Sequence, residues 1–234
     1  DTMRKGITFK GKHSYKDFGL TLKSRYISIP QKKKIKVSVP FQSGTYDFSH
    51  LYGSQAYEER ECQYVFHIRG DSVQEMEVYQ QDVLNWLLHS PKEKLYDDYI
   101  PGYYFLAECE SAEFNDLNYI GELTVSFAAY PFKIAELPEG HDIWDKFNFV
   151  TDFAQDTKFH ISGEKQVTLY NPSAINIVPI IRATSQFEIV KDSTTYTVNP
   201  GETKDWRFSL DIGENKMTIR GSGEIEFIFW KEVV

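Results

Sequence analysis

The stretch ECQYVFHIRGDSVQEMEVYQQDVLNWLLHS, residues 61–90, carries the two clearest secondary-structure signals in the chain. In its first part apolar side chains alternate with polar ones, and this period of two is typical of a half-buried β-strand. The residues on the apolar face are Cys62, Tyr64, Phe66 and Ile68. Gly70 and Asp71 favour turns, so we expect the strand to end there.

The second part of this stretch predicts a helix over about residues 72–90. Ser72 is suited to the N-cap, and Glu75 three residues later completes a capping box. Pro91 disfavours the helical conformation at Ser90 and should end the helix. Apolar residues recur at helical spacing along one face: Val73, Met76, Tyr79, Val83, Trp86 and Leu87. The pattern predicts an amphipathic helix of about five turns that packs on a sheet.

Apolar runs on both sides of residues 61–90 predict further short strands. Before the linker described below they lie at residues 6–10, 20–24, 34–39, 103–110 and 121–127. After it they lie at residues 165–170, 177–184, 187–190, 194–198, 206–211, 217–220 and 223–230. Turns are predicted between the later strands, at residues 199–201, 213–215 and 221–223. Short strands at regular spacing, without a helical pattern, are typical of a β-sandwich.

The chain is therefore predicted to be mainly β and to form two domains. The N-terminal domain, residues 1–133, is expected to be β-sandwich-like with one amphipathic helix. Residues 134–147 contain Pro138 and Gly140 and are interpreted as a linker. Residues 148–234 are expected to form a second β-sandwich. A length of 234 residues is sufficient for two domains of ordinary size.

Composition excludes several classes of protein. No run of about 18 apolar residues is present, so we expect no membrane-spanning segment and no interaction with a membrane. Cys62 and Cys109 stand outside any zinc-binding spacing and are interpreted as reduced thiols. The six histidines form no metal-binding motif, so we expect no metal site. No nucleophile elbow, phosphate loop or dinucleotide fingerprint occurs. We therefore expect no catalytic residues, no cofactor and no enzymatic activity.

Two alternative functions involve saccharides, namely hydrolysis of a glycan and binding of a glycan. Glu108 and Glu110 are expected on one face of a strand, as the carboxylate pair of a glycan hydrolase would be, although a wet outer face explains them more simply. A carbohydrate-binding module recognising a bacterial surface glycan is the stronger alternative, because flat rings stack on sugars. The candidate stacking residues are Trp206, Trp230, Tyr170 and Tyr196.

Charge is unevenly distributed along the chain, whose net charge is −8. Residues 1–60 carry 12 Lys/Arg and 5 Asp/Glu, whereas residues 61–130 carry 3 and 13. The basic part includes a run of Lys32, Lys33 and Lys34, followed by Lys36. The run lacks interleaved arginines or aromatics, so we interpret it as a solvated loop leading into a strand and expect no sequence-specific nucleic-acid binding.

Several short motifs occur in a characteristic order. They are GITF at residues 6–9, HSYKDFGL at 13–20, VP at 39–40 with GTYD at 44–47, YEER at 57–60, LNWL at 84–87, GELTVSF at 121–127 and YPF at 130–132. Together they resemble the distal tail protein (Dit, baseplate hub) family of long-tailed bacteriophages and prophages. In the second domain, NP at 171–172 and VPI at 178–180 are similar to the family's galectin-like sandwich. FQSG at 41–44 departs from the charged, glycine-rich turn frequent in the family.

The resemblance implies a tail-tube-like first domain and a homo-hexameric ring at the tip of the virion tail. The first domains would form the ring, and the galectin-like second domains would lie outside it. Implied partners are other copies of the chain, the tail tube protein, the tail-tip or tail-fibre protein and, in some phages, a receptor-binding protein. Synthesis would take place in the bacterial host cytoplasm.

A ring built by rotation requires two different complementary surfaces on each subunit. The oppositely charged regions of the first domain are candidates for these surfaces. The candidate residues at the ring interface are Lys32, Lys33, Lys34, Lys36, Arg60, Glu75, Asp82, Glu108 and Glu110.

Overall fold

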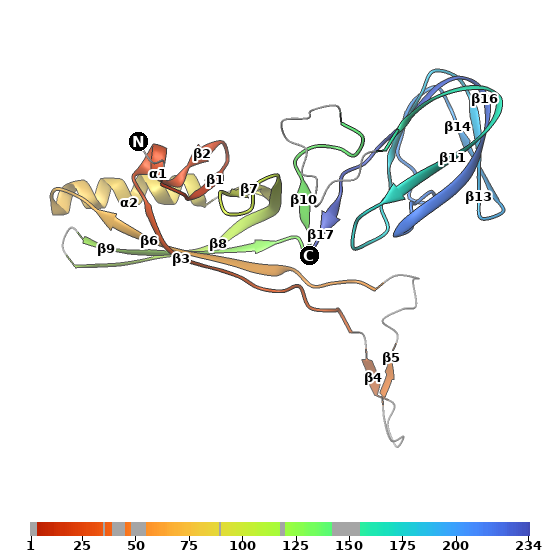
Figure 1. Ribbon diagram of the computed structural model, residues 1–234. Coiled ribbons are helices and arrows are strands. Elements are labelled where there is room, and N and C mark those ends of the chain that lie inside the picture. Colours follow the sequence, from red (N-terminus) through yellow and green to blue (C-terminus); the bar gives the residue numbers. More distant parts are fainter. Residues whose placement is uncertain are drawn as a thin grey trace. The chain divides into compact units, whose positions relative to one another are not determined.

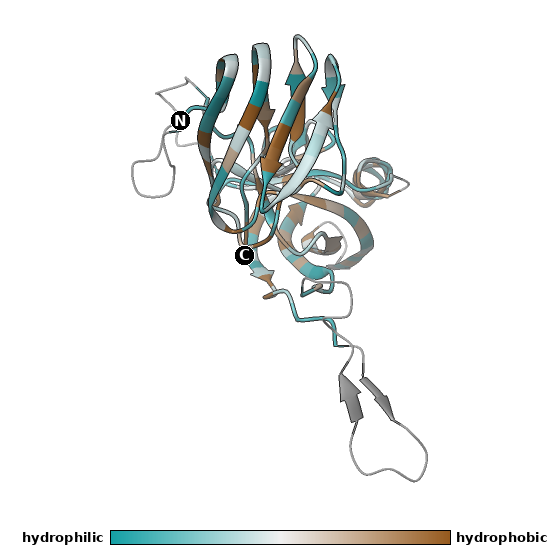
Figure 2. Cartoon of the chain, turned by 90° about the vertical axis from the view of Figure 1, so that its right-hand side faces the viewer, coloured by the Kyte–Doolittle hydropathy of each residue, from teal (hydrophilic) through white to brown (hydrophobic). Residues whose placement is uncertain are grey.

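The computed structural model describes residues 4–34, 36–38, 45–47, 55–88, 90–117, 120–141 and 155–234. The chain divides into two compact units, Asp1–Lys133 with Val234, and Ile134–Val233 (Figure 1). Both units consist mainly of antiparallel strands, which confirms the predicted fold class. Figure 2 shows polar and apolar residues alternating along the strands, as expected where one face of a sheet is buried.

The first unit contains one large antiparallel sheet with the strand order β2-β1-β7-β8-β9-β6-β3. These strands are β1 (Ile7–Phe9), β2 (Lys12–His13), β3 (Thr21–Ile27), β6 (Arg60–Arg69), β7 (Glu93–Asp97), β8 (Tyr103–Leu117) and β9 (Ile120–Ala129). A separate pair consists of β4 (Lys36–Ser38) and β5 (Thr45–Asp47). The helices are α1 (Ser14–Phe18) and α2 (Val73–Leu87).

The alternation that opens the sequence places one face of β6 in the core. Cys62, Tyr64 and Phe66 are fully buried, and Ile68 is almost so. The neighbouring strand β9 contributes alternate residues to the same cluster, and α2 covers it with Met76, Val83, Trp86 and Leu87. At the start of α2, Ser72 Oγ accepts a hydrogen bond from the Glu75 backbone N–H at 3.2 Å.

The first sheet curls so that β3, at one edge, approaches β7, the third strand from the other edge. In a flat sheet β3 and β7 would stand roughly 19 Å apart, because four spacings of about 4.8 Å separate them. Instead Arg25 Nη1 on β3 lies 2.7 Å from Asp97 Oδ2 on β7. The hydroxyl of Tyr64 on β6 donates to the same oxygen at 3.1 Å. The buried carboxylate of Asp97 therefore fastens the curled sheet across its interior.

His13 joins β2 to α1. Its Nδ1 accepts hydrogen bonds from the backbone N–H groups of Tyr15 and Lys16, at 3.1 and 3.2 Å, and so caps the helix. Because Nδ1 is an acceptor, Nε2 carries the proton and donates to Asp98 Oδ2 at 2.9 Å. This histidine has a structural role.

The second unit is built around two very long strands. β11 (Lys158–Asn171) and β16 (Gly213–Ile228) pair from Lys158↔Glu226 to Asn171↔Gly213. The other edge of β16 pairs with both β12 (Ile180–Ala183) and β13 (Phe187–Lys191). β14 (Thr194–Val198) and β15 (Gly201–Thr203) complete the order β14-β13-β16-β12-β15.

Gly221 and Gly223 lie inside β16, so the turn predicted at residues 221–223 is wrong. Their φ angles are +143° and +134°. A Cβ added at Gly221 would stand 2.5 Å from the Phe187 ring, which is buried in the core. The glycines are there because the backbone bends and passes close to Phe187, and not because the strand ends.

Two neighbouring predictions also need correction. Residues 213–215 begin β16 instead of forming a turn between strands. Residues 206–211 form no strand, since their ladder pairing is the isolated bridge Ile177↔Leu210. Asp205 accepts hydrogen bonds from the backbone N–H groups of Arg207 and Phe208. These bonds favour a turn at the start of the segment, although its apolar residues alternate as they would in a strand.

The chain enters and leaves the second unit on paired segments. β10 (Lys133–Ala135) pairs with β17 (Glu232–Val233). Ala135 N donates to the Lys231 carbonyl, and Glu139 N donates to the Phe229 carbonyl, both at 2.8 Å. Strand β10 thus lies at the start of the predicted linker 134–147, and residues 142–147 of that linker are outside the described residues.

Candidate assembly surfaces

Helix α2 is fixed to the first unit by its buried face. The Trp86 ring stacks on Phe18 with centroids 4.5 Å apart, and Trp86 Nε1 donates to the Phe9 carbonyl at 2.8 Å. The Tyr79 hydroxyl donates to the Phe18 carbonyl at 2.5 Å. These contacts hold the helix in one orientation, so its other faces present a defined surface.

The exposed side of α2 is acidic. Glu75, Glu77 and Asp82 are exposed, and the helix contains no basic residue. Val78 is 61% exposed, and Val73 is 48% exposed although the apolar spacing placed it in the core. Val73 is the first residue of α2. A shallow hollow of about 370 Å³ is lined by Gln74, Glu75, Val78, Tyr79 and Asp82.

The run Lys32–Lys34 is held by its backbone. Lys32 forms a bridge with Tyr57, and Lys33 N donates to the Ala56 carbonyl at 2.8 Å. Gln55 Nε2 donates to the Lys33 carbonyl at 3.0 Å. The three side chains are exposed, and none of them forms an ion pair within the described part of the chain. Lys36 lies in β4, and its side chain is outside the described residues.

Arg60 does not belong to an exposed surface, which corrects its selection as an interface candidate. It is 5% exposed, its Nε donates to the Ser28 carbonyl at 2.9 Å, and its guanidinium lies 5.4 Å from the centre of the Phe105 ring. Burial lowers the pKa of Arg60. The side chain packs at the start of β6 and supports the core.

Glu108 and Glu110 lie on β8, close to an irregularity in its pairing with β9. Cys109 pairs with Phe127 and Ser111 with Ser126, so Glu110 has no partner residue and forms a bulge. Glu110 is exposed and Glu108 is half-buried. The bulge breaks the strict alternation on which the prediction of a shared face depended.

The four aromatic candidates of the second unit differ in how far their side chains are exposed. Tyr196 packs edge-on against buried Phe208, with centroids 5.1 Å apart, and Trp230 is half-buried. Tyr170 is 38% exposed, whereas Trp206 is 82% exposed.

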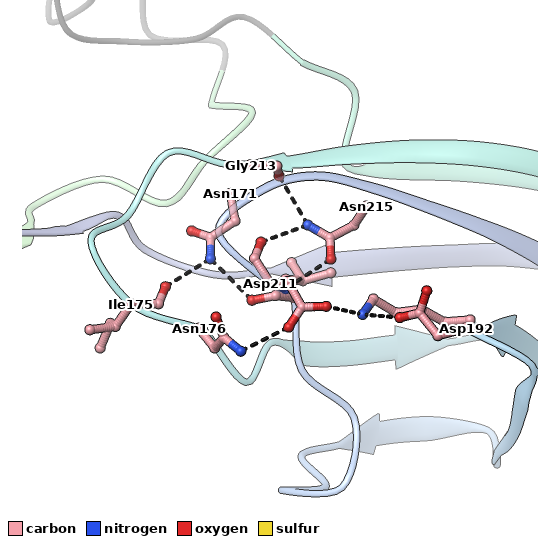
Figure 3. Close-up of polar contacts among 9 residues, drawn as sticks. Asn171, Ile175, Asn176, Asp192, Asp211, Gly213 and Asn215 are labelled. Atoms are coloured by element: carbon pink, nitrogen blue, oxygen red, sulfur yellow. Dashed lines mark hydrogen bonds and ion pairs between the residues drawn. The ribbon is translucent and has the colours of Figure 1, made fainter. Parts of the chain in front are cut away.

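A polar network at one end of the second unit stabilises its loops (Figure 3). Asn215 Nδ2 donates to the carbonyls of Asp211 and Gly213, at 2.8 and 3.0 Å. Lys191 Nζ lies 2.6 Å from Asp211 Oδ2 and 2.8 Å from Asp192 Oδ2. Burial lowers the pKa of Lys191, but the hydrogen bonds to the two carboxylates outweigh burial and raise it. The Lys191 ammonium group therefore lies between two carboxylates, and the donors and acceptors of this cluster are paired with one another.

Within the described ranges, no group of three or more His, Cys, Asp or Glu side chains is arranged to hold a metal ion. No helix of those ranges is sufficiently long and apolar to cross a membrane. Cys62 and Cys109 are free thiols, and burial raises their pKa values to about 12 and about 11.

The architecture is that of a phage tail protein. It is similar to the crystal structure of Dit from phage SPP1, with a TM-score of 0.67 and 12% identity over 99% of this chain and 100% of that one. That protein is described as a paradigm of the hub adsorption apparatus in phages that infect Gram-positive bacteria. The sequence matches the phage tail protein RIFT-related domain family over residues 9–129, and the chain belongs to this family. The predicted resemblance is thus confirmed at the level of family and fold.

Two structures of the phage p2 baseplate in its activated conformation are more distant. The structure with Sr gives a TM-score of 0.36 at 11% identity, covering 92% of this chain and 88% of that one. The structure with Ca gives 0.39 at 10% identity, covering 99% and 97%. No curated protein matches the sequence.

Proposed function

We propose that this protein is a structural component of the phage tail tip that assembles into a hexameric ring. The ring joins the tail tube to the tail-tip or tail-fibre protein and, in some phages, to a receptor-binding protein. The observation that carries the proposal is the similarity to SPP1 Dit along the whole chain, which includes both units. The protein acts by binding other proteins, without catalysis or a cofactor.

The two predicted domains have different roles in this proposal. Residues 1–133 form the ring, and residues 148–234, the galectin-like domain of the prediction, lie outside it. Membership of the phage tail family rests on residues 9–129, which supports the assignment of assembly to the first domain. Its charge is segregated, with lysines at Lys32–Lys34 and carboxylates on α2, as unlike surfaces of a rotational ring require.

Glycan recognition by the second domain is not favoured. A binding module should present two or three coplanar exposed rings, whereas Tyr196 and Trp230 are at least half-buried. Trp206 and Tyr170 are exposed, at 82% and 38%, and the neighbours of Trp206, Asp205 and Arg207, are bound to each other.

Imaging and labelling test the proposal. Negative-stain electron microscopy of the purified chain, with a mass measurement, should show six-fold rings. Gold-labelled antibodies against the chain should bind at the tail tip of virions of the phage that encodes it. Label along the tail tube or on the capsid would refute the proposed location, whatever the purified protein does.

A further inference from the structure

The exposed side of α2 has the composition of a binding surface for a lysine-rich segment. Glu75, Val78 and Asp82 are separated by three and four residues, so they lie on one side of the helix. Val78 and Tyr79 form the apolar part of the hollow, and the carboxylates of Glu75 and Asp82 border it. A lysine side chain matches this arrangement, because its methylene stem packs on apolar atoms while its ammonium group reaches a carboxylate.

These carboxylates have no cationic partner in the described part of the chain. Glu75 accepts a hydrogen bond from the Asp71 backbone N–H at 3.3 Å, and no lysine or arginine lies within ion-pairing distance of Glu75 or Asp82 there. The acidic side of α2 is therefore uncompensated within one copy.

The run Lys32–Lys34 carries positive charge on a backbone that is held in place. Its backbone is fixed against residues 55–58, since Glu58 N also donates to the Gln31 carbonyl at 2.8 Å. Fixing the backbone lowers the entropy that the segment would lose on binding. The three ammonium groups remain exposed and uncompensated in the described structure. Exposed cations of this kind suit a carboxylate-rimmed surface on another molecule.

We propose that the side of α2 formed by Glu75, Val78 and Asp82 in one copy binds the Lys32–Lys34 segment of the next copy. This inference rests on the proposed ring assembly and names the surfaces that form it. The two surfaces differ and occur once per chain, so the contact is heterologous, and repeated rotation closes it into a ring. The complementarity of charge identifies a second copy of this chain as the occupant.

Charge reversal with rescue tests the contact in the full-length chain. The lysine variant is K32E/K33E. The helix variant is E75Q/D82K, in which the glutamine side chain still offers an oxygen to the Asp71 backbone N–H before α2. The control, K204E/K216E, reverses two exposed lysines of the second unit. Far-UV circular dichroism verifies that each variant is folded.

Self-association is measured by sedimentation velocity at about 0.05 M and about 1 M NaCl, because the Debye length falls to about 3 Å at the higher salt. At low salt, each interface variant should raise the dissociation constant about tenfold or more, equivalent to about 1.4 kcal/mol. The control should change it less than about twofold. Combining the lysine and helix variants in one chain should recover part of the lost association, because the lysine of D82K then faces the glutamates of K32E/K33E. High salt should weaken association of the wild-type chain.

Three results would overturn the contact: interface variants that associate like the wild type, a combined variant weaker than either parent, or a wild-type chain that stays monomeric at low salt. None of these decides the location of the protein. Labelling at the tail tip tests the proposed function separately, so failure of the contact and failure of the function are distinguishable.

Discussion

Replacing Asp97 by alanine should loosen the curled first sheet. Asp97 is 3% exposed and accepts hydrogen bonds from Arg25, Tyr64 and the Tyr99 backbone N–H. Losing the buried bond from the Tyr64 hydroxyl to a charged acceptor costs about 1.5–3 kcal/mol. The pair with Arg25, whose side chain is 33% exposed, adds about 1 kcal/mol at most. We expect Asp97→Ala to lower the free energy of unfolding by about 3 kcal/mol.

Tyr64→Phe is the matched control, since it removes the hydroxyl alone and leaves Asp97 with its other donors. It should cost about 1.5 kcal/mol, the low end of the range for a hydrogen bond to a charged group, because no hydroxyl is left unpaired. Differential scanning calorimetry measures both, and the larger loss should lower the first unit's unfolding temperature by about 10 °C. If Asp97→Ala changes the stability by less than about 0.5 kcal/mol, the carboxylate does not fasten the sheet.

Three further predictions concern other parts of the chain. Gly221→Ala should destabilise the second unit by about 2–4 kcal/mol through contact with Phe187, whereas Gly163→Ala, at the paired position, meets no atom within 4 Å and should cost about 1 kcal/mol in urea unfolding. Trp206→Ala should change stability by about 0.5 kcal/mol or less because the ring is 82% exposed; a larger loss would show that it packs on the unit. With a pKa of about 12, Cys62 should resist iodoacetamide at pH 9 in the native protein but react in urea, as measured by mass spectrometry. Because the unfolded chain releases this proton at lower pH than the folded one, stability should fall between about pH 9 and pH 12, and a flat profile in urea unfolding would contradict the burial.

The sequence predicts the structure best where local pattern and tertiary packing agree. The alternation from Cys62 to Ile68 produces the buried face of β6, and Ser72 caps α2 as its spacing with Glu75 predicts. Both signals are local, and burial against the sheet reinforces them.

Predictions fail where a distant contact decides the local conformation. The sequence pattern predicts a turn at Gly221, but the close approach of Phe187, which is far away in the sequence, requires glycine there. Arg60 is predicted to be an exposed cation because it is charged, but its side chain is buried in contact with Ser28 and Phe105. The role of Asp97 depends on the curling of the sheet, which no local pattern encodes. Val78 falls outside the apolar spacing of α2, and that misfit is the one signal that could have identified its exposed position.

The paired segments at the start and end of the second unit have an evolutionary consequence. Because the Ala135 and Lys231 backbones are hydrogen-bonded, the first and last segments of this unit lie side by side. A module with adjacent ends can be exchanged, enlarged or removed without stretching the polypeptide on either side. Recombination that exchanges this unit would therefore leave the sequence of the first unit unchanged.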